Sequence, residues 1–417
     1  MDLFENLSDN QIEAVKTIDE DLEIIACAGA GKTGVVTRRI INILKSNPDI
    51  LPENIVAFTF TEKAAEELKS RVYKYGEAVL GNTKGFANMY IGTIHGFCLK
   101  MLQEYIVQFQ KFTVLDEIKT KLYIEKNYNF CGMPDLGLKI YTETNLFLSV
   151  MSTLNENWFE RDKWDEKTRA AVDKYKDSFY RKNYFDYSLI MQEMLNQLEN
   201  NKDFADIILS KIKYLTVDEY QDTNFAQHLI VSQLCKKHRN LCVVGDDAQS
   251  IYSFRGANIR NILSLPKQYP DMKMFKLEQN YRSTKNILNA ANSLIAKNKE
   301  QIQKNIFSDN PTGGKIPVIE AFSDYEESYI VANKLIEIKM LQGGSYEDFA
   351  ILYRTNAQSR VLEESLRKRN IPYRIYGGLS FYQHKEIKDA LCYFRVAVNP
   401  DDDEALRRII NFPARGI

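Results

Sequence analysis

A short segment near the start of the chain has the residue types and spacing of a phosphate-binding loop. ACAGAGKT, Ala26 to Thr33, directly follows an apolar run. Small residues let backbone N–H groups wrap around phosphates, and a following helix points its positive end at them. Lys32 would reach the β- and γ-phosphates, and Thr33 would hold Mg²⁺. The loop predicts a nucleoside triphosphate bound with Mg²⁺ through Ala28, Gly29, Ala30, Gly31, Lys32 and Thr33.

The loop departs from the usual pattern at its first position, where Ala26 stands in place of Gly. The alternative interpretation is a glycine-rich turn without a ligand. An expected strand before the loop, the GKT sequence and an expected helix after it favour the phosphate site over that turn.

A pair of carboxylates follows another apolar run, in LTVDEYQD. A strand-end aspartate such as Asp218 fixes Mg²⁺ in P-loop ATPases, and an adjacent carboxylate such as Glu219 can polarise the attacking water as a general base. Successive residues of a strand face opposite sides, so the pair is expected where the strand frays into a loop. A lone Asp-Glu pair more often caps a helix or lies in solvent. The prediction therefore depends on the phosphate loop, since one sheet can supply both.

The elements that must position these residues alternate between short apolar runs and helical patterns, which predicts a parallel sheet with crossover helices. From Cys98 to about Ala205 the chain is rich in Tyr, Lys and Glu at helical spacing, which indicates a helical insertion. A second alternating block begins at about Lys276, and the pattern is helical again after Gly378. Strands are expected in the first block at residues 22–28, 54–60, 214–220, 241–247 and 273–280, and in the second at 316–322, 349–355 and 372–378.

Composition narrows the class of protein. With 417 residues the chain is long enough for two to four domains, and its net charge of -1 means that any nucleic-acid site must be a local basic and aromatic stripe. The six cysteines include no C-x-x-C pair, which argues against a zinc cluster or a disulfide framework. The acidic start lacks a signal-peptide pattern, and no apolar stretch is long enough to span a bilayer. We expect a cytoplasmic protein that is not bound to a membrane.

Taken together, the motifs resemble the superfamily 1 DNA helicases of the UvrD/PcrA/Rep type. The match runs in order along almost the whole chain, and the segment that resembles motif III, VVGDDAQSIYSFRGA, agrees nearly residue for residue. The segments are LSDNQIEAV (residues 7–15, the Q motif), FTFTEKAAEEL (58–68, Ia), IGTIHGFC (91–98, Ib), VDEYQDT (217–223, II), residues 243–257 (III), LEQNYRST (277–284, IV) and the stretches after it.

For the nucleotide site, the resemblance implies ATP and Mg²⁺ bound between two RecA-like domains. Gln11 would read the adenine edge and Tyr281 would stack on the base. Gln249 would touch the γ-phosphate, and Arg282 would reach it as an arginine finger in cis. The expected catalytic residues are thus Lys32, Glu219, Gln249 and Arg282, with Thr33 and Asp218 as the metal ligands.

For the nucleic acid, the resemblance implies a single-strand track across the same domains. Phe60, Tyr252 and Phe254 are expected as stacking platforms, which tolerate any base. Their alternative role is ordinary core packing. Thr59, Thr93, His95 and Arg255 are expected to contact the backbone of the strand. The chain departs from its relatives at Gly34, where Arg is frequent, at Phe254, where many have Trp, and at His384, where Arg is common.

The resemblance also divides the chain. An α/β, RecA-like P-loop motor domain (residues 1–98 and 206–275) would carry the helical insertion (99–205), followed by an incomplete second RecA-like domain (276–380) and the start of a second helical insertion (381–417). Motifs V and VI would lie beyond Ile417, so we expect an incomplete motor with weak ATP turnover by itself.

Three functions are compatible with a phosphate loop of this kind. The resemblance implies an ATP-dependent helicase or translocase on single-stranded DNA and duplex junctions, moving 3′→5′, in DNA repair or replication; protein partners are not implied. The alternative is an ATP-regulated single-strand DNA-binding subunit without unwinding activity. An unrelated P-loop enzyme such as a nucleotide kinase has no need of the GDDAQSIYSFRGA segment.

Overall fold

The structure, a computed structural model, describes residues 2–376, 385–398, 400 and 402–416. Its chain divides into two compact units, Met1–Ile316 and Pro317–Ile417. The first unit holds every candidate site residue named above. The finer division into four domains stays a prediction.

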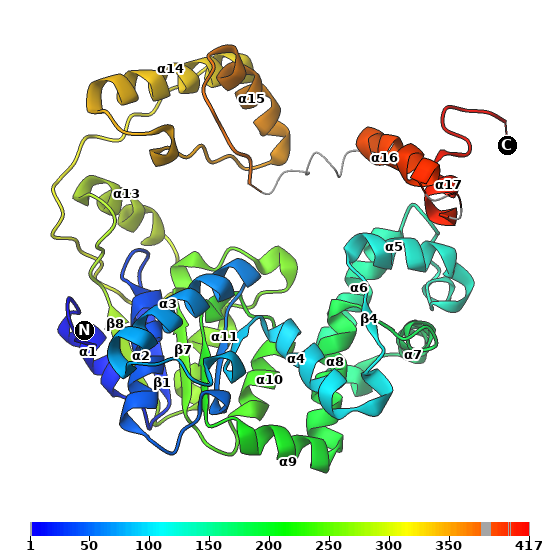
Figure 1. Cartoon of the computed structure of the whole chain (residues 1–417), viewed down its shortest axis with the longest axis horizontal. Coiled ribbons are helices and arrows are strands. Elements are labelled where there is room, and N and C mark those ends of the chain that lie inside the picture. The colour runs from blue at the N-terminus through cyan, green and yellow to red at the C-terminus, as the bar shows by residue number, and fades with distance from the viewer. Residues whose placement is uncertain (1, 377–384, 399, 401, 417) are drawn as a thin grey trace. The chain divides into compact units, whose positions relative to one another are not determined.

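The first unit is built on a six-stranded sheet in which every pairing is parallel (Figure 1). Its strand order is β3-β2-β6-β7-β1-β8. The five strands expected from the first alternating block are confirmed, and the short β3 is an addition that the sequence pattern did not predict. The strands are β1 (Leu22–Ala26), β2 (Ile55–Phe58), β3 (Tyr90–Gly92), β6 (Tyr214–Val217), β7 (Leu241–Gly245) and β8 (Lys273–Leu277).

Both faces of this sheet are covered, as the apolar runs require. Alternation along β1 sends Ile24 to one face and Ile25 to the other, and the two residues belong to different core clusters. The first face packs on α1 (Asp9–Lys16), α2 (Lys32–Ser46) and α3 (Glu62–Leu80), and the second on α4 (Ile94–Tyr105), α8 (Tyr187–Asn200), α10 (Phe225–Leu234), α11 (Arg260–Leu263) and α12 (Leu265–Gln268).

Helices fill the chain between β3 and β6, as the composition of this stretch predicted. They surround a two-stranded parallel ribbon of β4 (Thr113–Val114) and β5 (Tyr184–Phe185). Apolar residues of these helices form one continuous core with the second face of the sheet. This insertion is therefore fixed to the sheet by α4 and α8 (Figure 1). Its other helices are α5 (Glu117–Lys126), α6 (Thr144–Glu156), α7 (Glu166–Tyr180) and α9 (Lys202–Lys211).

After β8 the chain forms α13 (Lys285–Ile295) and then returns along the end of the strand. Phe307 pairs in parallel with Gln279; its amide donates to the carbonyl of Glu278, and its carbonyl accepts from the amide of Asn280. This returning strap, residues 301–310, lies across the edge where the sheet strands end.

The second unit corrects the prediction for the second alternating block. None of residues 316–322, 349–355 and 372–376 is in a strand, and residues 377 and 378 of the last expected strand lie outside the described residues, as does His384. The described elements are helices: α14 (Asp324–Gln342), α15 (Ser359–Lys368), α16 (Lys385–Val398) and α17 (Asp403–Ile409).

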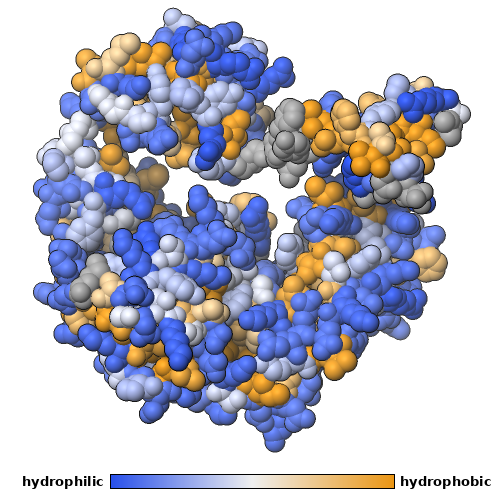
Figure 2. All heavy atoms as spheres, in the orientation of Figure 1, coloured by the Kyte–Doolittle hydropathy of each residue, from blue (hydrophilic) through white to orange (hydrophobic). Residues whose placement is uncertain are grey.

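The physical reason is the lack of a partner. A strand exists only when its backbone is hydrogen-bonded to a neighbour, and no backbone bond among the described residues joins these three segments. Several of their apolar side chains are left in solvent, with Val318 91% and Leu352 93% exposed. Hydrophobic side chains are accordingly visible on the surface of this unit (Figure 2). The alternation of apolar and polar residues predicts which face of a segment would be buried, but it does not predict whether a neighbouring strand is present to pair with it.

Two further results concern the whole of the described chain. All six cysteines are buried free thiols. Among the described helices, none is both long and apolar enough to cross a membrane.

A first prediction tests the buried polar network of the insertion. The Tyr175 hydroxyl donates to the buried Asp186 carboxylate, which also accepts from Ser188 and from the amide of Leu189. Tyr175→Phe leaves one carboxylate oxygen without its donor, so we expect the insertion to lose about 1–3 kcal/mol. Both tryptophans of the chain, Trp158 and Trp164, lie in the insertion, so urea unfolding followed by tryptophan fluorescence measures the loss.

The cost should depend on pH. Burial raises the pKa of Asp186 above its ordinary value of 3.8, while the Tyr175 bond counteracts this by stabilising the charged form. The substitution should therefore cost more at neutral pH than in mild acid, where the carboxyl takes up a proton. Tyr180→Phe is the matched control, because Glu193 keeps Lys176 and Gln197 when it loses the Tyr180 hydroxyl. Equal losses in the two variants would contradict this account.

Candidate nucleotide site and nucleic-acid groove

The phosphate loop leaves the carboxyl end of β1 and ends where α2 begins, at Lys32. Gly29 and Gly31 are left-handed, with φ of 73° and 79°. A Cβ on Gly29 would lie 2.8 Å from Cβ of Arg282, so this position also needs a glycine for close approach. Thr33 lies in the first turn of α2. The strand, the turn and the helix N-terminus thus make a cradle that fits phosphate.

The two predicted catalytic side chains at this edge meet directly. The Lys32 ammonium donates to both Glu219 oxygens, at 3.0 and 2.8 Å. Glu219 follows the end of β6 with a left-handed φ of 52°, a strained conformation for a residue with a side chain. This turn removes the strict alternation of the strand and lets Asp218 and Glu219 serve one site, as the sequence argument required.

The metal-binding prediction rests on Asp218 and Thr33. Burial, and then the neighbouring Glu219, raise the pKa of Asp218 to about 6, while Lys32 counteracts them. No cluster of three or more His, Cys, Asp or Glu side chains suited to a metal occurs among the described residues. One carboxylate and one hydroxyl suit Mg²⁺ that completes its shell with water and phosphate oxygens. The residues present therefore fit a metal carried in with a nucleotide.

Gln221, which the sequence argument did not single out, connects Gln249 to the carboxylate of Glu219. Its amide nitrogen donates to Glu219 at 2.9 Å, and its amide oxygen accepts from the amide of Asp246 at 3.0 Å. Asp246 in turn accepts from the Gln249 side chain at 2.6 Å. The structure thus brings Gln249 into one hydrogen-bonded network with Glu219 and Lys32.

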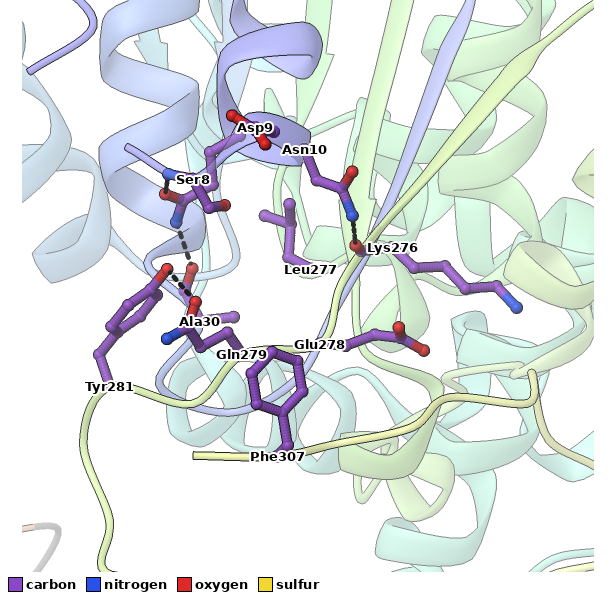
Figure 3. A pocket seen from close by; sticks show the side chains of 11 residues that line it. Ser8, Asp9, Asn10, Ala30, Lys276, Leu277, Glu278, Gln279, Tyr281 and Phe307 are labelled. Carbon is purple, nitrogen blue, oxygen red and sulfur yellow. Dashed lines mark hydrogen bonds between the residues drawn. The ribbon is translucent and has the colours of Figure 1, made fainter. Parts of the chain in front are cut away.

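A cavity of about 260 Å³ lies beside the loop, between α1 and the end of β8. Ser8, Asp9 and Asn10 face Gln279, Tyr281 and Phe307 across it (Figure 3). The size of the cavity and the half-exposed rings of Tyr281 and Phe307 suit a planar base. Phe307, on the returning strap, is a wall residue that the sequence argument missed, because its proximity depends on a pairing of distant segments.

Gln11 also lines this cavity and is 4% exposed. Its amide oxygen accepts from the amide of Ser8, and its amide nitrogen donates to the carbonyl of Ala30, both at 2.9 Å. An amide group has two donor hydrogens and two acceptor lone pairs, so one of each is left for a ligand. Gln11 therefore links the helix α1 start to the loop and still suits the recognition of an adenine edge.

The segment after β8 is tied to the loop by its backbone. Asn280, another residue missed from the sequence, donates to the carbonyl of Ala28 at 2.6 Å, and the amide of Tyr281 donates to the carbonyl of Gly29 at 3.1 Å. Tyr281 is 48% exposed, and its hydroxyl donates to Gln279. The exposed Arg282 follows directly. Its backbone is thus placed beside the loop that it is predicted to serve.

A groove of about 1200 Å³ runs between the sheet and the insertion and contains all the residues predicted to bind DNA. Phe60 and Tyr252 lie with ring centroids 4.8 Å apart, and Tyr252 and Phe254 6.0 Å apart. The Arg255 guanidinium lies over Tyr252 and Phe254. Phe254 is 73% exposed, so core packing does not explain it. Asp218 and Glu219 line the same groove, which therefore reaches the carboxylates of the nucleotide site.

Two of the residues predicted to contact the DNA backbone, Thr59 and Thr93, already use their hydroxyls in local hydrogen bonds. The hydroxyl of buried Thr59 donates to the carbonyl of Thr61, and that of Thr93 donates to Glu62 and accepts from the amide of Gly96, which caps α4. Burial lowers the pKa of His95 to about 4, so this ring is neutral. On the opposite wall, Lys121 and Tyr187 of the insertion line the groove and were not predicted.

Comparisons with known proteins agree with this geometry. A family profile described as the UvrD/REP helicase N-terminal domain matches residues 7–270, and one described as the UvrD-like helicase C-terminal domain matches residues 275–417. The chain is similar to proteins named ATP-dependent DNA helicase PcrA from Staphylococcus epidermidis, 41% identical over 426 residues, and Staphylococcus aureus, 40% identical over 429. The alignments cover the whole of this chain and 57% of each relative's length. With matched profiles over both parts and this identity along its full length, the chain belongs to the UvrD/REP family of helicases.

Proposed function

We propose that this chain is the ATP-hydrolysing and DNA-binding part of an ATP-dependent DNA helicase or translocase that acts on single-stranded DNA. One observation carries the proposal: a single groove holds both Glu219, paired with the loop lysine Lys32, and the stacked aromatics Phe60, Tyr252 and Phe254. A groove of this kind suits a strand of nucleic acid at the aromatics and a phosphoryl-transfer site at the carboxylates.

In the proposed reaction, the adenine of ATP occupies the cavity between Gln11 and Tyr281, and its phosphates lie in the loop. The γ-phosphate charge draws Lys32 away from Glu219, because the ammonium is needed where negative charge concentrates. The freed carboxylate orients water for attack as a general base. Thr33 and Asp218 would hold Mg²⁺, which neutralises phosphate charge when bound.

Two further groups are proposed to act on the γ-phosphate. Gln249 would respond to its loss through the network that includes Asp246 and Gln221. Arg282 would stabilise the charge that develops on the transferred group, as arginine fingers do. Because the phosphate loop is hydrogen-bonded to the segment that carries Arg282, we expect the position of this arginine to change when the bound ATP is hydrolysed.

On the DNA side, bases of a single strand are proposed to stack on Phe60, Tyr252 and Phe254, and Arg255 to pair with phosphate. Stacking of bases on aromatic rings does not depend on the base sequence, which suits a motor that must move along any DNA. From the family resemblance we propose 3′→5′ movement, loading at duplex junctions and a role in DNA repair or replication. A cytoplasmic location likewise stays a prediction.

The relatives' full activity is a proposal for this chain, since the chain spans 57% of their length. The competing candidate is an ATP-regulated single-strand DNA-binding subunit without unwinding activity. A steady-state ATPase assay with oligo-dT and a fluorescent strand-displacement assay separate the two. DNA-stimulated turnover with strand separation supports the helicase, whereas ATP-dependent binding without separation supports the subunit.

A prediction for the nucleotide site uses two variants of one ion pair. Lys32→Ala should abolish Mg·ATP binding, because the backbone cradle alone cannot offset the γ-phosphate charge. Glu219→Gln should keep binding and lower turnover by about 10²–10⁴-fold, the usual contribution of a general base. Equilibrium binding of a fluorescent ATP analogue and DNA-stimulated phosphate release measure the two effects. Unchanged affinity and turnover in Lys32→Ala would reject the phosphate-loop assignment.

A prediction for the groove concerns its exposed ring. Phe254→Ala should weaken oligo-dT binding by about 1–3 kcal/mol, the typical contribution of one stacked base, and Phe60→Ala by less. The control is Phe130→Ala, since Phe130 is also largely exposed but does not line the groove. Fluorescence anisotropy across a salt series measures affinity, with an expected log–log slope of about -0.7 per neutralised phosphate. Equal affinity of Phe254→Ala and the wild type would refute the stacking role.

A further inference from the structure

Lys304 is a buried cation that the proposed reaction has not used. It lies on the returning strap and is 4% exposed at its side chain. Its ammonium pairs with Asp246 and Asp247 at 2.5 Å each, and both carboxylates are as buried as the lysine. The amide of Ile302, two residues earlier, donates to Asp247 at 2.9 Å. The strap is thus anchored to the turn that follows β7 by two neighbouring points.

The charges around Lys304 show why a cation is required there. Glu23 of β1 is also buried beside Asp247 and has no hydrogen-bond partner among the described residues. Two of these carboxylates, Asp246 and Asp247, therefore share one lysine, and Glu23 adds a third carboxyl group beside Asp247. Burial alone would lower the pKa of Lys304, but the two aspartates outweigh it and raise the pKa. Without the ammonium, neighbouring buried carboxylates would repel one another and be forced to take up protons or move apart.

Asp246 connects this cluster to the nucleotide site. One of its oxygens accepts from Lys304 and from the amide of Ala248, and the other accepts from the Gln249 side chain. Its own amide donates to Gln221, which donates to Glu219. Asp246, the partner of Lys304, is therefore two hydrogen bonds away from Glu219, the proposed general base, through Gln221. It is directly hydrogen-bonded to Gln249, the residue proposed to contact the γ-phosphate.

The same strap also reaches the base cavity. Asn305 donates its amide to Glu278 at 2.6 Å, and Phe307 lines the cavity opposite Ser8, Asp9 and Asn10. Only two residues lie between Lys304 and Phe307. A single segment of chain thus contacts the cavity proposed for the base at one end and the network proposed for the γ-phosphate at the other.

We propose that Lys304 is a positioning residue for ATP hydrolysis: by holding Asp246 and Asp247 it fixes Gln249 and, through Gln221, Glu219. The inference deepens the proposed function and rests on it. Lys304 does not line the cavity or the groove, so it acts through the aspartates and not by touching ATP or DNA.

The test uses Lys304→Met in the full chain, which removes the charge and keeps most of the length of the side chain. Turnover should fall by about tenfold or more, as for outer groups that orient metal ligands. Affinity for a fluorescent ATP analogue should change by less than about twofold, since the cradle is intact. Hydrogen–deuterium exchange of the peptide covering residues 246–251 should rise, because the turn has lost its anchor.

Lys176→Met is the matched control, since it removes another lysine–carboxylate pair, Lys176–Glu193, whose carboxylate is buried in the insertion. It should lower stability without changing turnover or exchange at 246–251. If Lys304→Met does not fold, Lys304→Met/Asp247→Asn keeps the net charge of the cluster. Its turnover should still be low, because Asp246 lacks its anchor.

The possible results are distinct. Wild-type turnover in either folded Lys304 variant, unchanged exchange at residues 246–251, or an equal loss in Lys176→Met would overturn the inference. If the wild-type chain shows no DNA-stimulated ATPase at all, the proposed function fails. The exchange experiment still decides whether Lys304 fixes the turn.

Discussion

Negative charge collected at one edge of a parallel sheet is the constraint on which this structure depends. The carboxyl ends of β6 and β7 place Asp218, Glu219, Asp246 and Asp247 within one region. Two lysines from outside those strands hold them: Lys32 from the phosphate loop and Lys304 from the returning strap. The two cations differ in purpose. Lys32 is partly accessible and is the cation proposed to exchange its carboxylate for phosphate, whereas Lys304 is enclosed between its two aspartates.

This arrangement explains why the glycine loop, the strained turn at Glu219 and the segment after β8 must be built together. The loop approaches so closely that Gly29 has no room for a side chain beside Arg282. Asn280 and Tyr281 then bond to the loop carbonyls. A phosphate that enters the cradle would therefore change the loop, the arginine segment and the Glu219 turn at once. Such shared contacts are what a motor needs to convert hydrolysis into movement.

The groove has its own structural requirement, because its walls come from the sheet and from the insertion. The continuous apolar core beneath α4 and α8 fixes these walls relative to each other. Phe254 can then remain exposed without support from the core, next to Tyr252 and Arg255. The cation placed directly at the aromatics is Arg255, so the groove offers a local basic and aromatic site on a chain whose net charge is -1.

Local sequence patterns determined much of the fold of the first unit and much of its candidate nucleotide site. The loop sequence and the five apolar runs predicted the phosphate loop, the strands of the sheet and the Asp218–Glu219 pair, because each of these depends on residues that are close in sequence. Tertiary structure alone decided the rest. Gln221, Asn280, Lys304 and Phe307 gained their places by meeting segments far along the chain, and Lys304 reaches Asp246 across 58 residues. The expected strands of the second unit failed for the same reason: alternation describes a segment's own faces, whereas a strand also needs a hydrogen-bonded neighbour that no local pattern specifies.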